Sequence, residues 1–573
     1  MRVPLSWLRE MVAVDLPVER LVTVLDELGL AVESVTSVGE GLDGVVVAEV
    51  REIGPVPGAD RIRLVSVDAG ADEAVQVVCG AWNFEVGDRV PLATVGTVLP
   101  GGMAIARRRL RGVESNGMLC APDELGLPGG HDGILVLSGG ATPGTALAEA
   151  MGLQPDVVLE LEVNANRPDA SCVLGVARDL AAKLDLRLRP PEPVVLLSDD
   201  ARSVGEGVVD VEDTEVCGLF LARVLTDVVV RPSPPWVANR LTLAGMRPIN
   251  NVVDASNYVM LELGVPNHAY DRARLPGGAL RVRSARPGES LLTLDGVERR
   301  FEPGDCLICD AEDTPVGIAG VMGGASSEIG EATTEVLLEA AWWEPRAIAR
   351  TSKRLQLRTE ASSRFERGCD PEAIDLAVAR FCQLLADDGA AGPIGEALDV
   401  RTPALPAPAV VRLRTARANA LLGTALSDDE VRGHLDSLGF VTSALGGDGV
   451  CEVRVPSWRP DSALEVDVIE EVARLHGYGH ITRTVPRSPQ TGSLTSRQRR
   501  RRQARAVLVG AGCSEAWTPT FLAASLLERL GLSRADAVRV ANPLVAEEDL
   551  LRTALLPGLL GAVAANAAHR NLG

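Results

Sequence analysis

The hydrophobic period of the sequence changes at Val45, and this change constrains the fold more than any other feature. Before it, residues 1–38 are predicted to be helical, because Val18–Leu28 places apolar side chains at helical spacing and Gly29 ends the run. From Val45 onward, short stretches rich in β-branched residues alternate with Gly and Pro turns. Such a pattern predicts a small closed barrel, and an OB-type barrel, which binds oligonucleotides on one face, is one candidate.

Two arginine clusters occur in a chain whose formal net charge is −21. The acidic balance argues against a protein that coats nucleic acid non-specifically, but it leaves local RNA contacts open. One cluster lies within the predicted barrel and comprises Arg107, Arg108, Arg109 and Arg111, and the other runs from Arg497 to Arg505. On a barrel the first cluster would bind phosphates. Charge alone fits a solvated hairpin equally well.

At 573 residues the chain is too long for one core, and we expect roughly three to five domains. No run of about 18 apolar residues occurs, and Arg9 and Glu10 interrupt the apolar core that a signal peptide needs. We therefore expect a cytoplasmic protein without a membrane span. The ten cysteines include a single CxxC, Cys306–Cys309, with no second pair nearby for zinc, so reduced buried thiols are expected.

The stretch Gly245–Asp271 gathers polar groups among apolar residues. The polar side chains are those of Asn250, Asn251, Asp254, Ser256, Asn257 and His268. Hydrogen-bonding groups in an apolar frame favour a pocket for a small polar ligand. The alternative is a buried helix whose Asn and Ser side chains serve caps and turns.

A cluster of acids occurs near residue 467. Asp467, Glu470 and Glu471 stand at i, i+3 and i+4 and so share one helix face, and Asp461 lies just before that helix. Clustered carboxylates repel one another unless a cation or a basic partner is present, and oxygen ligands suit Mg²⁺. A solvated acidic face is the alternative on spacing alone.

Long motifs in a fixed order connect these features. They include VPGADRIRLVSVDAG and LRGVESNGMLCAPDELGL in the predicted barrel, ELE and NRPD within 160–169, GIAGVMGGASSEI at 317–329, LRTEASSRFERGCDP at 357–371, and ANPL and LRTALLPGLL near the end. Over nearly the whole chain they resemble bacterial phenylalanyl-tRNA synthetase beta subunits. Four positions depart from that family. Val56 and Gly58 stand where the family usually has His and Asn, Trp82 replaces Pro, and Ser256 replaces Thr.

The resemblance implies an α+β multidomain fold. Residues 1–38 and 152–190 would form an N-terminal α/β domain, into which an OB-type β-barrel, 39–151, is inserted as the tRNA-binding domain. An α/β editing domain would follow at 205–400, a winged-helix-like domain without a DNA function at 405–482, and part of a class II synthetase-like module at 490–573. By this resemblance the rest of that module and a C-terminal anticodon-binding domain would be missing, as in a truncated product, a fragment or an error in the gene model.

In that family the editing domain hydrolyses tyrosine wrongly attached to the tRNA for phenylalanine. A site that hydrogen-bonds the tyrosine hydroxyl selects tyrosine, because phenylalanine leaves its polar groups unpaired. Carried over by motif, the pocket comprises Ser256, Asn257, His268, Gly323, Glu339 and Ala361. Glu339 would accept the hydroxyl, and His268 and Ser256 would lie near the ester and a hydrolytic water. Alternatively, His268 is structural and Glu339 is paired with Arg364 or Arg367.

The resemblance also implies cofactors and partners. Asp461, Asp467, Glu470 and Glu471 would bind one Mg²⁺ per chain at the contact with an alpha subunit, within an α2β2 tetramer. That tetramer would attach phenylalanine to tRNA(Phe) using ATP, with the aminoacylation site on the alpha subunit, and the barrel arginines would contact the tRNA. A non-editing tRNA-binding scaffold and a stand-alone RNA-binding protein are the alternatives.

Overall fold

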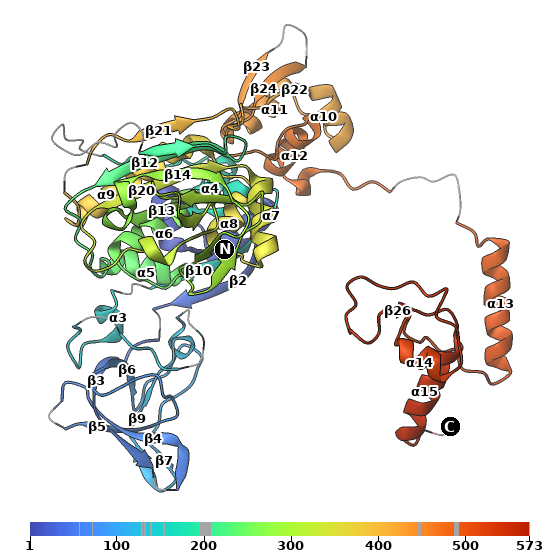
Figure 1. Ribbon diagram of the computed structural model, residues 1–573, viewed down its shortest axis with the longest axis horizontal. Coiled ribbons are helices and arrows are strands. Elements are labelled where there is room, and N and C mark those ends of the chain that lie inside the picture. The colour runs from blue at the N-terminus through green and yellow to red at the C-terminus, as the bar shows by residue number, and fades with distance from the viewer. Residues whose placement is uncertain are drawn as a thin grey trace. The chain divides into compact units, whose positions relative to one another are not determined.

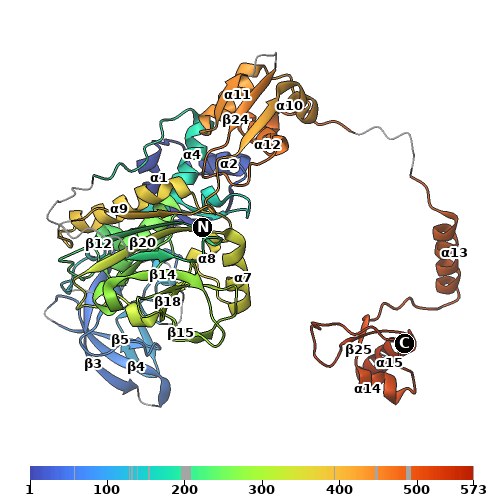
Figure 2. The same cartoon turned by 45° about the horizontal axis from the view of Figure 1, so that its top comes forward.

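The computed structural model describes residues 1–573 apart from 40, 57, 72, 128–129, 131–132, 138–139, 153–154, 195–207, 393, 445–448, 486–491 and 572–573. The chain divides into two compact units, Met1–Thr482 and Arg483–Gly573, each with a core of its own. In the first unit, most sheets are flanked by helices, while the strands from β3 to β9 form a lobe of their own (Figures 1 and 2).

A three-stranded antiparallel sheet joins distant parts of the first unit. Strand β10 (Asp156–Glu162) is hydrogen-bonded to both β1 (Arg2–Pro4) and β2 (Ala31–Val38), and it shares a core with α1 (Leu5–Met11), α2 (Val18–Glu27) and α4 (Val173–Leu184). The helix predicted at Val18–Leu28 is confirmed. The prediction of helix throughout 1–38 was wrong at β1 and at β2, because both strands pair with β10, a segment distant in sequence.

The stretch between β2 and β10 contains the predicted small barrel. Its antiparallel sheet has the order β5-β4-β3-β6-β9, formed by β3 (Val45–Val56), β4 (Ala59–Asp68), β5 (Val75–Cys79), β6 (Arg89–Thr94) and β9 (Gly117–Leu119). The sheet nearly closes, because the backbone N–H of Asn116 donates to the carbonyl of Gln76 on β5 at 2.9 Å. A hairpin of β7 (Arg108–Leu110) and β8 (Val113–Ser115) lies beside it, and α3 (Leu147–Ala150) follows.

Residues 209–401 contain two facing sheets. The first has the order β13-β20-β12-β21, formed by β12 (Cys217–Leu225), β13 (Asn267–Asp271), β20 (Val336–Trp343) and β21 (Leu398–Arg401). The second has the order β11-β14-β17-β18-β19, formed by β11 (Val209–Val211), β14 (Leu280–Ser284), β17 (Cys306–Cys309), β18 (Pro315–Ile318) and β19 (Met322–Gly323). A short hairpin joins β15 (Ser290–Leu292) and β16 (Glu298–Arg300).

Helices cover the first sheet on one side, and the second sheet covers it on the other. One face of β12 and β20 shares a core with α5 (Pro235–Leu243), α6 (Asn251–Leu263) and α9 (Ile374–Asp387). The opposite face shares a core with the second sheet, α7 (Pro345–Leu355) and α8 (Glu360–Phe365). A strand buried on both faces reads as a continuous apolar run, as VLLEAAWW in β20 does.

The first unit ends in a small sheet with three helices. The sheet has the order β22-β24-β23, formed by β22 (Val410–Arg414), β23 (Val441–Ala444) and β24 (Val450–Arg454). It packs with α10 (Thr415–Leu422), α11 (Asp428–Ser437) and α12 (Glu465–His476) around one core. The helices predicted near Asp428–Leu438 and at the acidic cluster are confirmed.

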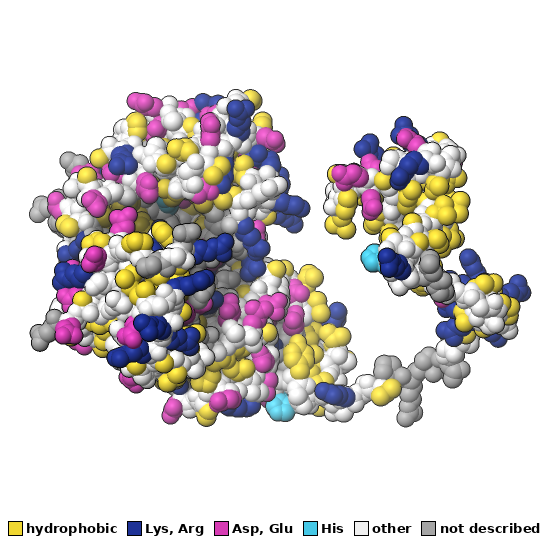
Figure 3. All heavy atoms as spheres, turned by 90° about the horizontal axis from the view of Figure 1, so that it is seen from below, with side chains coloured by type: hydrophobic (Ala, Val, Ile, Leu, Met, Phe, Trp, Pro, Cys, Tyr) yellow, Lys and Arg dark blue, Asp and Glu magenta, His cyan; other side chains and the backbone are white. Residues whose placement is uncertain are grey.

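Among the described residues of the second unit, three buried apolar side chains form its core. It comprises α13 (Ser496–Gly510), β25 (Phe521–Leu522), α14 (Ala524–Arg529), β26 (Leu550–Leu551) and α15 (Leu556–Ala568). The arginine cluster 497–505 lies on α13, which buries none of its residues. Positive and negative side chains are interspersed on the face of the molecule that Figure 3 shows. In the part of the chain that is described, no helix is long and apolar enough to cross a membrane.

Candidate active site

Strand β20 places Glu339 in the layer between the two facing sheets. Side chains alternate along a strand, and Leu338 belongs to the core shared with the helices, whereas Leu337 belongs to the core between the sheets. Glu339 therefore points to the same side as Leu337. Its direct partner across the antiparallel pair is His268 of β13. The fold thus sets a buried acid beside a histidine, although the two lie far apart in sequence.

A cavity of about 90 Å³ opens beside this pair, between the two sheets and α8. One water needs roughly 15 Å³, so the cavity is of the size class of a small side chain such as a phenol. Four predicted site residues line it, namely His268, Gly323, Glu339 and Ala361. The lining also includes Tyr270, Ile308, Gly317, Ile318, Met322 and Phe365.

Glu339 already accepts a hydrogen bond from a phenol. The hydroxyl of Tyr270 donates to Oε2 of Glu339 at 2.6 Å. Burial raises the pKa of Glu339 to about 7, and the hydrogen bond from Tyr270 opposes that rise. Burial, with the nearby charge of Glu339, holds the pKa of Tyr270 well above its usual value, so this hydroxyl remains a donor.

Of the two arginines expected as alternative partners of Glu339, Arg364 is engaged elsewhere. Arg364 donates to the carbonyl of Ser171 at 3.0 and 3.2 Å and to the carboxylate of Glu360 at 2.7 Å. The interpretation in which Arg364 neutralises Glu339 was therefore wrong. Glu339 is instead a buried acid whose hydrogen-bond donor is Tyr270.

His268 is the second polar group of the cavity. Its ring lies edge-on to that of Tyr270, with centroids 4.4 Å apart. Burial lowers the pKa of His268 to about 4, so the imidazole is neutral near pH 7. Its Nε2 is inaccessible to solvent and has no hydrogen-bond partner among the described residues. This nitrogen is a buried polar atom covered by the backbone of Gly323, so a water reaches it only when β19 shifts.

Gly323 gives the imidazole its space. A Cβ atom at this position would lie 2.5 Å from Cε1 and 2.6 Å from Nε2 of His268, closer than real Cβ contacts allow. Glycine at 323 thus allows β19 to pass directly over the ring. Ala361 approaches the same cavity from α8, whose first turn is fixed by a capping box between Thr359 and Ser362.

The rest of Gly245–Asp271 supports the pocket from behind. Ser256 on α6 donates from Oγ to the carbonyl of Asn267 at 2.8 Å, and Asn267 directly precedes His268. Asn250 caps α6 by accepting hydrogen bonds from two backbone N–H groups. Among the described residues, the cavity lining does not include Ser256 or Asn257. The structural alternative therefore describes α6 itself, while β13 carries the pocket side chains.

The barrel arginines lie on an exposed hairpin. All three residues of β7 are exposed. The turn that follows places Arg111 and Gly112 at φ values of 52° and 86°, the left-handed region that a two-residue hairpin turn requires. The guanidinium of Arg109 donates to the carbonyl of Gly112 at 3.0 Å. Both the phosphate-binding and the solvated-hairpin interpretations fit this placement.

The four acids predicted to bind Mg²⁺ do not converge on a common site. Asp461 and Glu471 accept hydrogen bonds from arginine side chains, Asp467 accepts from two backbone N–H groups at the start of α12, and Glu470 is exposed. No group of three or more His, Cys, Asp or Glu side chains in the described ranges is arranged to hold a metal ion. The donor set does not fit the predicted Mg²⁺ site within this chain.

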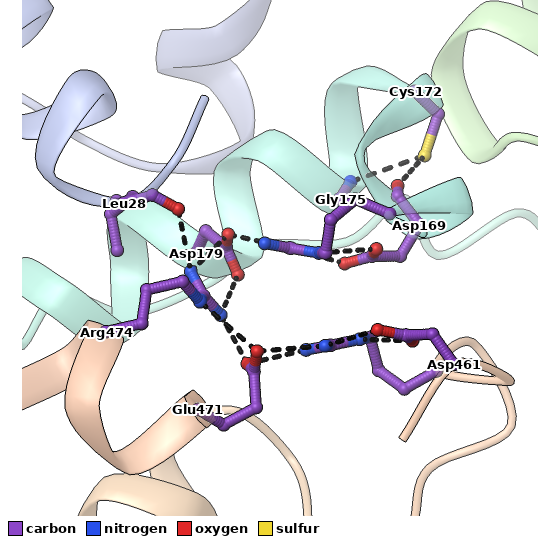
Figure 4. A network of polar contacts seen from close by, with 10 residues as sticks. Leu28, Asp169, Cys172, Gly175, Asp179, Asp461, Glu471 and Arg474 are labelled. Carbon is purple, nitrogen blue, oxygen red and sulfur yellow. Dashed lines mark hydrogen bonds and ion pairs between the residues drawn. The ribbon is translucent and has the colours of Figure 1, made fainter. Parts of the chain in front are cut away.

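Asp461 and Glu471 belong to a buried network of alternating charges, which we call the arginine ladder (Figure 4). Its members are Arg167, Asp169, Asp179, Arg459, Asp461, Glu471 and Arg474. Two Arg-Pro-Asp turns, 167–169 and 459–461, have the same geometry, with each arginine donating to both oxygens of its aspartate at 2.8 or 2.9 Å. Nη2 of each arginine also reaches an acid 12 positions later in the chain.

Arg474 joins the two halves of the ladder. It donates to Asp179 on α4 at 2.7 Å and to Glu471 on α12 at 2.5 Å. Burial disfavours the charged form of Asp179, but the positive charges of Arg474 and Arg167 outweigh it and lower its pKa. Burial likewise disfavours the charged form of Glu471, but the hydrogen bonds and charges of Arg459 and Arg474 outweigh it and lower the pKa of Glu471. The ladder therefore fastens α12 to α4 through ionised groups.

Sequence reasoning missed Tyr270 and the ladder. The signal for Tyr270 was its spacing from His268, because residues two apart on a strand share a face. The signal for the ladder was the repeated Arg-Pro-Asp, which occurs at 167–169 and again at 459–461.

Comparison with known families agrees with this organisation. Residues 45–146 match the family described as "Putative tRNA binding domain", and residues 216–388 match the B3/4 domain. Residues 411–478 match the tRNA synthetase B5 domain, and residues 481–572 match the phenylalanyl tRNA synthetase beta chain CLM domain. The cavity beside Glu339 lies within the B3/4 match.

Curated relatives align with almost the entire chain. A phenylalanine–tRNA ligase beta subunit of Anaeromyxobacter dehalogenans is 44% identical over 99% of this chain and 70% of its own length. The beta subunit of Geobacter sulfurreducens is 43% identical over 100% of this chain and 71% of its own length. On this similarity, the chain belongs to the family of phenylalanine–tRNA ligase beta subunits.

Proposed function

We propose that this chain is the beta subunit of an α2β2 phenylalanine–tRNA ligase that binds tRNA(Phe) and hydrolyses tyrosine wrongly attached to it. ATP-dependent attachment of phenylalanine takes place on the alpha subunit, in the cytoplasm. One observation carries the hydrolytic part of this proposal. The buried carboxyl of Glu339 binds a phenol hydroxyl at 2.6 Å, beside a neutral histidine with an unpaired nitrogen among the described residues.

Glu339 selects a tyrosyl group over a phenylalanyl group. Its Oε2 accepts the hydroxyl of Tyr270, and its Oε1 remains to bind a second hydroxyl, that of a tyrosyl group in the cavity. A phenylalanyl ring would desolvate this carboxyl without pairing it, at a cost of about 1–3 kcal/mol. Discrimination by a missing hydroxyl is strong in a site built to bind one.

His268 positions the water that attacks the ester. A shift of β19 gives a water access to Nε2, which accepts a hydrogen bond from it, and the oxygen of this water attacks the ester carbonyl carbon. A new carbon–oxygen bond forms, the ester bond to the ribose oxygen breaks, and the proton lost by the water is balanced by the proton gained by the ribose hydroxyl. With a pKa of about 4, His268 orients this water rather than holding its proton at pH 7.

The test compares deacylation of Tyr-tRNA(Phe) and Phe-tRNA(Phe) by the chain co-expressed with its alpha subunit. Wild type should hydrolyse the tyrosyl ester and spare the phenylalanyl ester. Glu339→Ala and His268→Ala should each slow the first reaction at least about 10-fold, with aminoacylation retained. Absence of deacylation by wild type would favour the non-editing scaffold, and a monomer in native mass measurements would favour a stand-alone RNA-binding protein.

The finer domain assignments belong to the same proposal. They are 1–38 with 152–190 as the N-terminal domain, 39–151 as an OB-type barrel, 205–400 as the editing domain, 405–482 as a winged-helix-like domain, and 490–573 as part of a class II synthetase-like module. The near-closed sheet of β3–β6 and β9 supports the second assignment, and the β22–β24 sheet with its three helices supports the fourth.

A further inference from the structure

An exposed tryptophan follows the third strand of the barrel. Trp82 lies in the loop after β5, and 63% of its surface is exposed. Tryptophan is enriched at interfaces, because its ring is apolar while its N–H is polar, so an indole at this place is a candidate contact for another molecule. Trp82 lies within the stretch that matches a tRNA binding domain.

The indole is held in place by its neighbours. The guanidinium of Arg63 on β4 lies 4.8 Å from the ring centroid of Trp82 and 4.3 Å from that of the buried Phe84. The same guanidinium donates to the carbonyl of Ala81 at 2.8 and 3.2 Å. The side chain of Asn83 exchanges hydrogen bonds of 2.8 and 3.0 Å with the backbone of Ile134. Both sides of the loop are thus anchored, and the exposed ring is preorganised.

The position of the ring matches a nucleic-acid contact. Barrels of this type bind oligonucleotides on their second and third strands, which here are β4, carrying Arg63, and β5, which leads into the Trp82 loop. The hairpin with Arg108 and Arg109 lies against the other end of β5, where Gln76 donates to the carbonyl of Glu114 at 2.8 Å. Phosphate-binding charge and an aromatic face therefore flank one strand.

We propose that Trp82 is a stacking platform for an unpaired base of the bound tRNA, and that Arg63 is the positioning residue that holds the platform. This proposal rests on the proposed tRNA binding by this chain. Every base has a π face, so stacking on an aromatic side chain contributes about 1–3 kcal/mol with little dependence on sequence. Stacking neutralises no phosphate, so it leaves the salt dependence of binding unchanged, unlike contacts made by arginine.

The experiment measures the affinity of the chain, assembled with its alpha subunit, for tRNA(Phe) at several salt concentrations. Trp82→Ala should weaken binding about 5- to 100-fold with the same dependence on salt. Trp82→Phe should restore most of the affinity, which also shows that the barrel still folds. The matched control is Trp517→Ala, because this tryptophan is 85% exposed but lies outside the barrel. Arg108→Gln with Arg109→Gln should lower the salt dependence instead.

Tryptophan fluorescence gives an independent readout. Binding of tRNA should quench emission in wild type and in Trp517→Phe, and Trp82→Phe should lose most of that quenching. Unchanged affinity of Trp82→Ala, with wild type binding normally, would overturn the platform and leave tRNA binding intact. Failure of wild type to bind tRNA would overturn both. Loss of alpha-subunit association without loss of tRNA affinity would make this surface a protein contact and overturn the proposal.

Discussion

Gly323 and His268 occupy adjoining space that leaves no room for a Cβ atom, which would lie 2.5 Å from Cε1 of the imidazole. The backbone of β19 therefore acts as a wall against which the ring rests. The orientation of His268 depends on a residue without a side chain, so adding a single methyl group at position 323 tests the role of this wall.

Gly323→Ala should reduce deacylation of Tyr-tRNA(Phe) at least about 10-fold, because the added methyl group displaces the ring from the position that binds the water. Binding of tRNA and aminoacylation by the complex should change little. The matched control is Gly433→Ala on α11, where a Cβ would meet nothing within 4 Å. Equal deacylation by the two variants would contradict the role given to the wall.

Glu339 makes the stability of the protein depend on pH. Its pKa is about 7 in the folded chain against an ordinary 4.5, so the folded state binds the proton more tightly than the unfolded state. Its contribution is therefore present at low pH and is lost as pH rises from about 4.5 to 7. Each pKa unit corresponds to about 1.4 kcal/mol, and the full loss is about 3 kcal/mol.

Glu339→Gln removes this titration while keeping an acceptor for Tyr270. The variant should gain about 2–3 kcal/mol of stability relative to wild type between pH 5 and pH 8. Denaturant unfolding at the two pH values, followed at the B3/4 segment by hydrogen exchange, measures the difference. A constant difference at both pH values would show that Glu339 titrates normally.

Ser256 should act through the backbone of β13. Removing its hydroxyl removes the hydrogen bond of 2.8 Å to the carbonyl of Asn267, which costs about 1 kcal/mol and loosens the strand that carries His268. We expect Ser256→Ala to slow deacylation about 3- to 10-fold through kcat, and Ser256→Thr to retain activity. A loss above about 1,000-fold for Ser256→Ala would indicate direct participation in the chemistry instead.

Arg474→Met should destabilise the first unit by about 3–5 kcal/mol, because it leaves Asp179 and Glu471 buried beside fewer positive charges. Arg417→Met is the matched control, since this arginine is half exposed and its pair with Glu465 lies at the surface. Thermal unfolding of the two variants, with and without a chelator, measures the effect. A chelator that destabilised wild type as much as Arg474→Met would restore the metal interpretation of the acidic cluster.

Acid should loosen the same contact. The pKa values of Asp179 and Glu471 are lowered from ordinary values of 3.8 and 4.5. Their contribution is present at neutral pH and is lost as pH falls below those values toward the lower pKa of the folded state. Limited proteolysis between α11 and α12 should accelerate as pH falls from 5 to 3 in wild type. Arg474→Met should already be cleaved rapidly at pH 5.

Local sequence patterns predicted individual helices better than they predicted which distant segments pair with one another. Val18–Leu28 and Asp428–Leu438 are helices because their apolar spacing suffices to bury one face. Ala31–Val38 was mispredicted because its fate depends on β10, more than a hundred residues later. The resemblance implied only that His268 and Glu339 belong to one pocket. Their pairing across two strands was not predicted, because the residues are 71 positions apart in sequence.

The acidic cluster shows a different limit. Helical spacing correctly placed Asp467, Glu470 and Glu471 along α12, but spacing reports only neighbours on the same helix. The arginines that neutralise Glu471 are Arg459, in the turn before the helix, and Arg474, one turn later on the same helix. Arg474 also donates to Asp179, which belongs to α4. The sequence predicts that clustered acids need a cation or a basic partner, but only the fold identifies the arginines that serve as that partner.

The arginine ladder bears on the order in which the chain can fold as it is made. Residues 1–184 contain Arg167, Asp169 and Asp179, whose charges are fully neutralised only when Arg474 has been synthesised. Until then Asp179 has Arg167 as its arginine partner, so we expect the N-terminal sheet and its helices to stay partly assembled until almost 300 further residues have been made. Contacts so distant in sequence form slowly and leave intermediates open to misassembly. In a ribosome-bound chain that ends before residue 474, the N-terminal sheet and its helices should therefore depend on chaperones. The barrel should depend on them less, because all its strands have been synthesised by residue 119.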